Sequence, residues 1–573
     1  MKSIINLLFI LSIFFLSLEA NENLAQDDYW LKLLHSQTTI STIDANKELE
    51  RTLTLFKTDP NSLCQYPARY KWINSKLHLN LSKPSCPRLK IFKDLHFKKL
   101  SVVFTSERYD SPASVFGHTM MKIETDTIPY AINYSAKIQD NINSLEYMFK
   151  GVSGKFKSGY SFIPFSTKDY EYRSGEFRDL ITFELHLTPD EIENIMLYFY
   201  EIQKSKENYY FLSHNCSSEL LKLIDMAKYN SKLSKEFSSV TIPINIIYTL
   251  QKYHYITKIT TQYSKLKQFY TIINQLNPKE KDILYKITHL HYSVNKFAQD
   301  TKFSDSSKSL LVDAGIKYFE IISTKEHLTQ KALYPFLKLI KLQLKYKKRK
   351  DFIQQKVLDK NPISNRFHKL YVGISSHHNI DATIIGFRYL YRNRFDLVDS
   401  IKKNGSVEFL DIAVRREEKE NKISLEHLTF INLEAMPVSN IFFQETINKI
   451  KIETARVFED DKLYSYCNYG LGYRYRLNKF IDYQFYAKTG LYYHTKPFYL
   501  TSAEISFEYN YRSRFISELM LEYNYFTNNI IQQNISLTNY IKLTSTTKIG
   551  VDISYENVIN RRELQFRWSY LFP

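Results

Sequence analysis

Cysteine is scarce in this chain, and long apolar runs are scarce too. None of the cysteines directly follows the apolar N-terminal segment, so we expect no lipid-anchored N-terminus of the usual kind. That segment, Ile4 to Leu18, is about 15 residues long and therefore short for a membrane-spanning helix. With Lys2 before it and Ala20 after it, it predicts a secretory signal peptide over residues 1–20, with an uncleaved anchor as the alternative.

Acidic residues are outnumbered: 60 Asp and Glu stand against 78 Lys and Arg, which gives a formal net charge of +18. Such an excess can indicate nucleic acid or an anionic membrane surface as a partner. Here the lysines are spread along the chain and alternate with acids, and the chain is expected to be exported. We therefore expect no nucleic-acid partner. The length of 573 residues predicts two to four domains.

The scarcity of cysteine makes each one informative in an oxidising compartment. Cys64 and Cys86 are close in sequence and each lies near a proline, so we predict that they form a disulfide. Cys467 lies in an alternating segment, YSYCNYGLGYRY, and is expected to be a small wall residue of a strand. Cys216, in FLSHNCSSELLKLID, is a nucleophile, a disulfide partner of Cys467 or a small core residue.

Changes in pattern divide the rest of the chain into four regions, which predict a multidomain α+β protein. Residues 21–100 are helical in pattern, and the expected disulfide hairpin lies at their end. Residues 101–229 mix strands such as SVVFTSE, HTMMKIET, PYAINYSA and ITFELHL with helices, one of which starts at Thr188. Residues 230–360 are predicted to be a lysine-rich helical connector. Their basic run Lys345–Lys350 is interpreted as a solvated helix end, with anionic lipid headgroups as the alternative partner.

Residues 361–573 alternate apolar and polar residues in segments of about 10 residues separated by turn residues, and they are rich in Tyr and Phe. The last segment, ELQFRWSYLFP, places Phe566, Trp568, Tyr570 and Phe572 on one face. Together with the signal peptide, this pattern predicts an antiparallel outer-membrane β-barrel of roughly 12 strands. A soluble β-sandwich is the alternative.

Two short stretches carry the candidate chemistry. SVFGHTMMKIE places His118 at the start of a strand, and HNCSSELLKLID places Cys216 at the start of a helix. The free N–H groups and positive dipole of a helix N-terminus lower a thiol pKa, and a nearby histidine can act as base and then as acid. The spacing of His118, His214 and Cys216 matches no known ligand pattern, so we expect no metal site and no cofactor. From spacing alone, a structural cysteine remains open.

Ser101 to Asp225 resembles the Lnb N-terminal periplasmic domain, the bacterial lipoprotein N-acyltransferase family. The motifs that carry the resemblance are SPASVFGHTMMKIE, AINYSA, FKGVSGKFKSGYSFIPF, EYRSGEFRDLITFELHLTPDEI and YYFLSHNCSSELLKLID. FGH and NCS are weak alone but fairly specific in this order. The resemblance implies a circularly permuted papain-like fold, similar to lecithin:retinol acyltransferase-type enzymes and permuted NlpC-type amidases. In that fold the histidine strand precedes the cysteine helix, as it does here.

The resemblance implies that Cys216 is the nucleophile and His118 the base. The third, orienting group of such sites usually lies on the next strand, where AINYSA offers Asn133. Tyr160 and Gly154 are candidates for the substrate cleft, because the glycines Gly151, Gly154 and Gly159 predict a tight loop there. Asn215 is an expected N-cap and a second candidate for substrate contact.

The sequence therefore predicts a cell-envelope protein, in the outer membrane with a periplasmic domain, that contacts outer-membrane lipid. Its expected activity is a cysteine-dependent acyltransferase or hydrolase that acts through an acyl-thioester, with lipoproteins or peptidoglycan as candidate partners. A peptide or peptidoglycan amidase, a non-catalytic outer-membrane scaffold and a channel are the alternatives. The transferase activity is known for some family members only, and the strand-rich C-terminal region departs from the domain that carries the resemblance.

Overall fold

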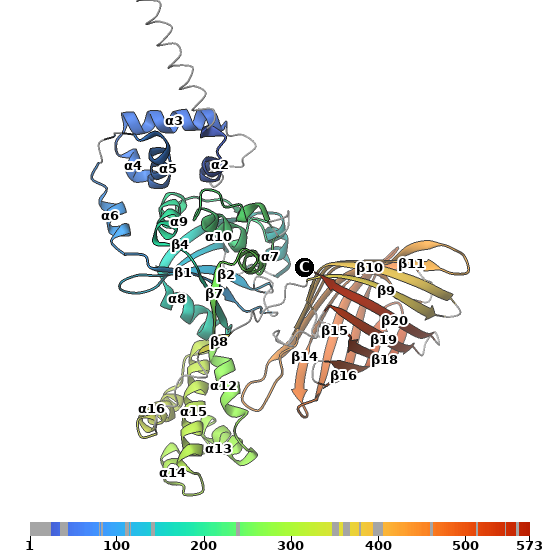
Figure 1. The fold of residues 1–573 in the computed structure, drawn as a ribbon. Coiled ribbons are helices and arrows are strands. Elements are labelled where there is room, and N and C mark those ends of the chain that lie inside the picture. The colour runs from blue at the N-terminus through green and yellow to red at the C-terminus, as the bar shows by residue number, and fades with distance from the viewer. Residues whose placement is uncertain are drawn as a thin grey trace, which may run out of the picture. The chain divides into compact units, whose positions relative to one another are not determined.

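The computed structural model describes residues 24–34, 44–79, 81, 84–108, 114, 116–138, 142, 144–211, 213–236, 241–346, 355–358, 367–377, 380–392, 405–458, 462–511, 514–544, 546–556 and 561–572. The expected signal peptide and residues 347–350 of the basic run lie outside them. The chain forms two compact units (Figure 1). The first comprises residues 1–106 and 116–360, and the second comprises residues 107–115 and 361–573.

Short helices open the first unit: α2 (Asp28–Leu34), α3 (Ala45–Thr58), α4 (Ser62–Gln65), α5 (Pro67–Leu77) and α6 (Pro87–Lys93). The predicted disulfide is confirmed, since Cys64 of α4 is bonded to Cys86 at the start of α6. The carboxylate of Glu201, in α9 (Pro189–Ile202), accepts hydrogen bonds from the backbone N–H groups of Ala68 and Arg69. These N–H groups have no partner within α5, so the contact caps the helix and ties it to α9.

An eight-stranded antiparallel sheet forms the centre of this unit, in the order β6-β4-β3-β2-β1-β5-β7-β8. The strands are β1 (Lys99–Thr105), β2 (His118–Glu124), β3 (Tyr130–Lys137), β4 (Phe156–Pro164), β5 (Leu180–Leu185), β6 (Asn208–Tyr209), β7 (Ile256–Gln262) and β8 (Gln355–Leu358). Between them lie α7 (Ser144–Val152), α8 (Phe165–Tyr170), the π-helical turn η2 (Glu171–Gly175), α9 and α10 (Cys216–Asp225). Helix α10 packs on β2 and β3.

Local sequence explains these elements. In β1, KLSVVFT, every residue after Lys99 is buried, as expected for a central strand covered on both faces. Helix α9 begins with a capping box: the Thr188 side chain accepts from the N–H of Glu191, and the Glu191 carboxylate accepts from the N–H of Thr188. The predicted strands of residues 101–185 and the helix after Thr188 are therefore present.

Two expectations about local structure were wrong. The region interpreted as a helical connector supplies β7 and β8 to the sheet, because ITKITTQ carries β-branched residues that pair with β5. Gly159, expected in a loop, lies inside β4, where the strand pairs with β3.

The remainder of the first unit is helical: η3 (Leu233–Glu236), α11 (Asn245–Lys252), α12 (Lys265–Ile273), α13 (Pro278–Thr288), α14 (Val294–Gln299), α15 (Asp305–Lys325) and α16 (Gln330–Gln343). Helix α15 packs against α12, α13 and α16. Most of these helices start at a side-chain cap, formed by Ser264, Asn277, Ser293, Ser304 or Thr329. Among the described helices, none combines the length and the apolar character needed to cross a membrane.

The second unit is a closed antiparallel barrel of twelve strands. Each strand pairs with the strands before and after it in sequence, and the last strand, β20, pairs with the first, β9, to close the barrel. The strands are β9 (His368–His377), β10 (Ile380–Arg392), β11 (Gly405–Glu417), β12 (Ile423–Ala435), β13 (Thr446–Arg456), β14 (Leu463–Arg476), β15 (Ile481–Tyr493), β16 (Pro497–Tyr511), β17 (Phe515–Phe526), β18 (Ile531–Lys542), β19 (Thr547–Glu556) and β20 (Arg561–Phe572). The prediction of roughly 12 strands is confirmed. The sandwich alternative is wrong, because a sandwich has open edges and this sheet has none.

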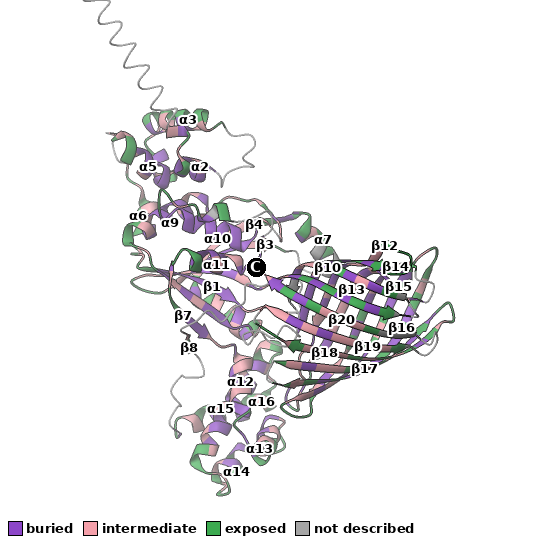
Figure 2. Ribbon diagram, turned by 45° about the vertical axis from the view of Figure 1, so that its right-hand side comes forward, coloured by how far each residue is buried: buried purple, intermediate pink, exposed green. Residues whose placement is uncertain are grey.

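The barrel is polar inside and apolar outside, and Figure 2 shows buried and exposed residues along the same barrel strands. In β16, Glu504 and Ser506 are buried while Ile505 and Phe507 between them are exposed. Tyrosines, phenylalanines and Trp568 of β20 are exposed on the same outward face. A closed barrel with an apolar outer face spans a membrane, because each backbone polar group in the wall pairs with a neighbouring strand.

Candidate active site

The candidate nucleophile, Cys216, is the first residue of α10 and is only 1% exposed. Asn215 before it is the N-cap. Its side-chain oxygen accepts hydrogen bonds from the N–H groups of Ser217 and Ser218, and its side-chain nitrogen donates to the carbonyls of Phe211 and Thr241. The cap function is thus established, and the amide is fully used within the protein. Its predicted contact with substrate stays a prediction.

His118 begins β2, in register with Thr105 of β1. Gly117 before it has φ +81°, and a Cβ there would lie 2.5 Å from the ring of Phe104 and 2.8 Å from the carbonyl oxygen of Thr105. Only glycine fits this backbone, so the FGH motif has a structural reason. The glycine allows the chain to enter β2 with the histidine next to α10.

His118 and Asn133 meet across adjacent strands. Nε2 of His118 and Oδ1 of Asn133 are 2.6 Å apart, and Nδ2 of Asn133 donates to the hydroxyl of Ser135 at 3.3 Å. Because Asn133 accepts from Nε2–H, the other ring nitrogen, Nδ1, is left for the thiol of Cys216. The structure therefore brings the three predicted catalytic residues together as a chain Cys216–His118–Asn133.

The electrostatics of the pair favour the ionised thiol. Burial raises the pKa of Cys216, but the charge of His118, its hydrogen bond and the adjacent Thr119 outweigh burial and lower this pKa to about 7. Burial lowers the pKa of His118, yet the thiolate and the hydrogen bond to Asn133 raise it above the ordinary value. Both shifts stabilise a thiolate–imidazolium ion pair near neutral pH.

Three contact residues were missed by sequence reasoning: Thr119, Tyr172 and Tyr209. Thr119 follows His118 in β2 and lies near the sulfur. Tyr172 lies in the π-helical turn η2 and stacks on His118, with ring centroids 5.9 Å apart. Only the position of Thr119 directly after His118 gave a local signal, because the other two approach from segments distant in sequence.

Tyr209 contacts the backbone of the nucleophile. Its hydroxyl accepts from the N–H of Cys216 at 3.4 Å, and it also bonds to the thiol. The residue is 9% exposed and burial raises its pKa well above the ordinary value, so the hydroxyl keeps its proton. A hydroxyl and a backbone N–H beside a nucleophile are the kinds of donor that stabilise an oxyanion.

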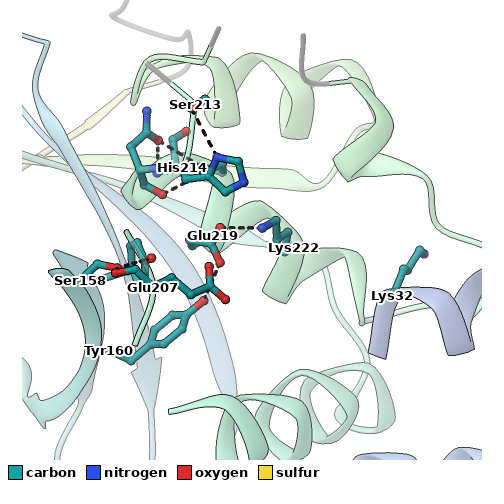
Figure 3. A network of polar contacts seen from close by, with 12 residues as sticks. Lys32, Ser158, Tyr160, Glu207, Ser213, His214, Glu219 and Lys222 are labelled. Atoms are coloured by element: carbon teal, nitrogen blue, oxygen red, sulfur yellow. Dashed lines mark hydrogen bonds and ion pairs between the residues drawn. The ribbon is translucent and has the colours of Figure 1, made fainter. Parts of the chain in front are cut away.

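Tyr160 and Gly154 are not placed against the thiol by any contact in the described residues. The hydroxyl of Tyr160 donates to the buried carboxylate of Glu219 at 3.4 Å, and Lys222 forms an ion pair with the same carboxylate at 2.7 Å (Figure 3). Gly154 has φ +70°, and a Cβ there would lie 2.1 Å from the ring of Tyr210. Both residues therefore support the segments around α10, and their predicted roles in substrate binding stay predictions.

The remaining cysteine, Cys467, lies in the wall of β14. Cys216 and Cys467 are both free, so the alternative of a disulfide between them is wrong.

Comparisons with known proteins agree with this division of the chain. Residues 89–253 match the family model of the Lnb N-terminal periplasmic domain, and residues 364–572 match that of a domain of unknown function, DUF7840. A search of curated proteins gave no match.

Solved structures similar to this chain include outer-membrane proteins, each matched over about a third of this chain. They include the KdgM porin in complex with disordered oligogalacturonate (11% identity, TM-score 0.24) and the NanC porin (8%, 0.25), each matched over 36% of this chain and 99% of the other. Omp33 of Acinetobacter baumannii is 8% identical over 36% of this chain and 99% of its own, with a TM-score of 0.21. Such low TM-scores carry no argument, and the barrel rests on its own strand pairing and apolar outer face. The chain is therefore an envelope protein with an Lnb N-terminal periplasmic domain at residues 89–253 and a C-terminal twelve-strand outer-membrane barrel.

Proposed function

We propose that this protein is a cysteine-dependent acyltransferase or hydrolase of the cell envelope that acts through an acyl-thioester on Cys216. The observation that carries the proposal is the chain Cys216–His118–Asn133, with a thiol pKa lowered to about 7 at the start of a helix. A buried cysteine with no chemical role would have its pKa raised by burial. Here charge and hydrogen bonds reverse that effect.

In the first step, the thiolate of Cys216 attacks the carbonyl carbon of an ester or amide and forms a C–S bond. The hydroxyl of Tyr209, held beside the nucleophile by the N–H of Cys216, is the donor we assign to the resulting oxyanion. When the tetrahedral intermediate collapses, the bond to the leaving oxygen or nitrogen breaks, and the imidazolium of His118 supplies its proton. The products are the acyl-thioester and the protonated leaving group.

In the second step, an amine or a water molecule attacks the thioester carbonyl and His118 takes its proton. The C–S bond breaks, Cys216 leaves as a thiolate, and the acyl group departs as an amide or a carboxylate. Asn133 holds the imidazole so that Nδ1 faces the sulfur throughout both steps. The two steps balance in atoms and electrons without an oxidant, a reductant or a metal ion.

A lipid acyl donor is the substrate class that the setting supports best. The chain carries a membrane-spanning barrel, and residues 89–253 match the family model of the Lnb N-terminal periplasmic domain. The resemblance of the motifs around His118 and Cys216 to that family implies lipoprotein N-acyl transfer. Transfer to the amine of a lipoprotein is therefore the leading reaction. Hydrolysis of a peptide or peptidoglycan amide is the second candidate, because the same three groups serve it when water replaces the amine.

The test is intact-mass spectrometry of the detergent-solubilised protein, with Cys216→Ala beside it and Cys467→Ala as the matched control. We expect a fatty-acyl adduct that hydroxylamine removes, present in the wild type and in Cys467→Ala and absent from Cys216→Ala. A Cys216 that stays unmodified with phospholipid but cleaves a peptide amide would select the amidase. A thiol that neither acquires an adduct nor reacts with alkylating agents would overturn the proposal.

A further inference from the structure

Helix α16 carries an apolar stripe that the first unit does not bury. Leu333, Leu337, Ile340 and Leu344 recur at intervals of three and four residues, so they lie on one line along the helix. They are 42%, 55%, 39% and 87% exposed. Tyr334 beside them is also exposed. Exposed apolar side chains gathered on one helix face in this way indicate an interaction surface.

The opposite face of α16 is fixed by packing, so the stripe is not a core face that has turned outward. Pro335 and Leu339 are buried on that side. Leu339 packs so closely on α15 that a Cβ on Gly315 would lie 2.7 Å from its Cδ1 atom. Rotation of α16 to bury the stripe would break this contact. The helix is therefore held with Leu337 directed outward.

A basic arc lies next to the apolar stripe. Residues 330–350 contain no acidic residue and include Lys331, Lys338, Lys341 and Lys345 within the described helix and turn. At 100° per residue, these four lysines fall on the side of the stripe where Tyr334 lies. In the described part of the chain, no ion pair is formed by any of them, and Lys338 lies over the ring of Tyr334 at 5.4 Å.

We propose that α16 is an interfacial helix that docks on the surface of the membrane that the barrel spans, with anionic phospholipid headgroups as the partner of its lysines. An apolar stripe flanked by lysines is the pattern of a helix that lies at the boundary between headgroups and acyl chains. Leu344 is separated by 24 positions in sequence from His368, where the first membrane-spanning strand begins. Strand β8 of the first unit's sheet lies between these two positions, so covalent attachment of that unit to the barrel keeps the membrane surface at high effective concentration.

The charge pattern favours a bilayer over a protein partner. A protein partner would need acidic residues along the whole basic arc as well as an apolar groove for the stripe, whereas an anionic headgroup layer supplies both the negative charge and the apolar boundary. This inference does not depend on the chemistry of Cys216. It gives the helical region of residues 265–346 a function of its own, as a second membrane contact besides the barrel.

The test uses the full chain in proteoliposomes. A single cysteine is introduced as Leu337→Cys, or as Ser323→Cys on the exposed surface of α15 as the matched control, in a background with Cys216→Ser and Cys467→Ser. Each is labelled with an environment-sensitive NBD dye. Quenching is measured with a nitroxide phospholipid and with aqueous iodide, in vesicles of phosphatidylcholine alone and with phosphatidylglycerol. Heat-modifiable mobility on gels confirms that each variant contains a folded barrel.

We expect lipid quenching at position 337 to exceed that at 323 at least about two-fold and iodide quenching to be weaker, with a larger difference in phosphatidylglycerol. Adding Lys338→Glu and Lys341→Glu to Leu337→Cys should remove the preference for phosphatidylglycerol. Equal quenching at the two positions in both vesicles would overturn the proposal. So would protection of position 337 from both quenchers, because a protein surface, such as a second copy of the chain, would then cover the stripe.

Discussion

The ionisation of Cys216 gives the sharpest prediction. Burial and His118 shift its pKa in opposite directions, and a substitution of His118 removes only the second effect. Burial raises the pKa of the thiol, and His118 with Thr119 lowers it from the ordinary 9.0 to about 7. We predict that His118→Ala or His118→Gln returns this pKa to 9 or above, since burial then acts with little opposition. His214→Ala, an exposed neighbour of the helix start, is the matched control and should leave the pKa near 7.

The size of the expected change in alkylation rate decides which measurement is informative. A fall of two pKa units raises the thiolate fraction at pH 7 from about 1% to about half, a gain of about 50-fold. A less basic thiolate is also less nucleophilic, by about 6- to 10-fold over two units, so the net gain in rate at pH 7 is only about 5- to 8-fold. The absolute rate is therefore a weak criterion, and the shape of the pH profile is a strong one.

The assay is alkylation of the native protein by iodoacetamide between pH 5 and 10, followed by mass spectrometry of the peptide that contains Cys216. Cys467→Ala removes the other free thiol. In the wild type the rate should rise with a midpoint near pH 7 and reach a plateau by about pH 8. In His118→Ala it should still be rising at pH 9. A wild-type profile without a plateau below pH 9, or a plateau that survives loss of His118, would refute the ion-pair reasoning.

Three further predictions concern the orientation of the histidine, the loop before it and the disulfide. Asn133→Ala should lower turnover by about 10- to 100-fold while the amount of folded protein stays normal. Asn133→Asp should restore part of the activity, because a carboxylate also accepts from Nε2–H of His118. Equal losses in the two variants would argue against an orienting role. Gly117→Ala should displace the start of β2, because its Cβ would meet Phe104 and Thr105 at under 3 Å; the expected cost is about 1–3 kcal/mol in thermal unfolding of the first unit, and an unchanged melting temperature would contradict it. Replacing Cys64 and Cys86 by alanine should destabilise the N-terminal helices by about 3 kcal/mol, as the bond closes a loop of 22 residues; protease resistance of residues 24–93 that matches the wild type would show that the loop is held by other contacts.

Local sequence pattern was sufficient to predict a structural feature wherever neighbouring residues are its physical cause. The capping box at Thr188 specifies the start of α9 through hydrogen bonds three residues apart. The proline-flanked Cys64 and Cys86 predicted a short-range disulfide, and alternation of apolar residues predicted the barrel strands. In β7, by contrast, seven β-branched and polar residues lie in a helical neighbourhood, and only pairing with β5 decides that they form a strand.

In the candidate site too, some features follow from local sequence and others only from tertiary packing. The sequence by itself determined that Cys216 starts a helix capped by Asn215, and that His118 starts a strand after a glycine, because caps and turns are fixed by a few neighbouring residues. Only the tertiary structure decided that the strand of His118 lies under that helix and that Asn133 holds the imidazole.

Two further features depended on tertiary structure alone. The placement of Tyr209 and Tyr172 around the pair joins segments far apart in the chain. The exposure of the α16 stripe followed from which face of the helix packs on α15, since periodicity shows that a helix has an apolar face but not which faces the core covers. Contacts of this kind depend on how the elements pack in three dimensions, which no short stretch of sequence specifies.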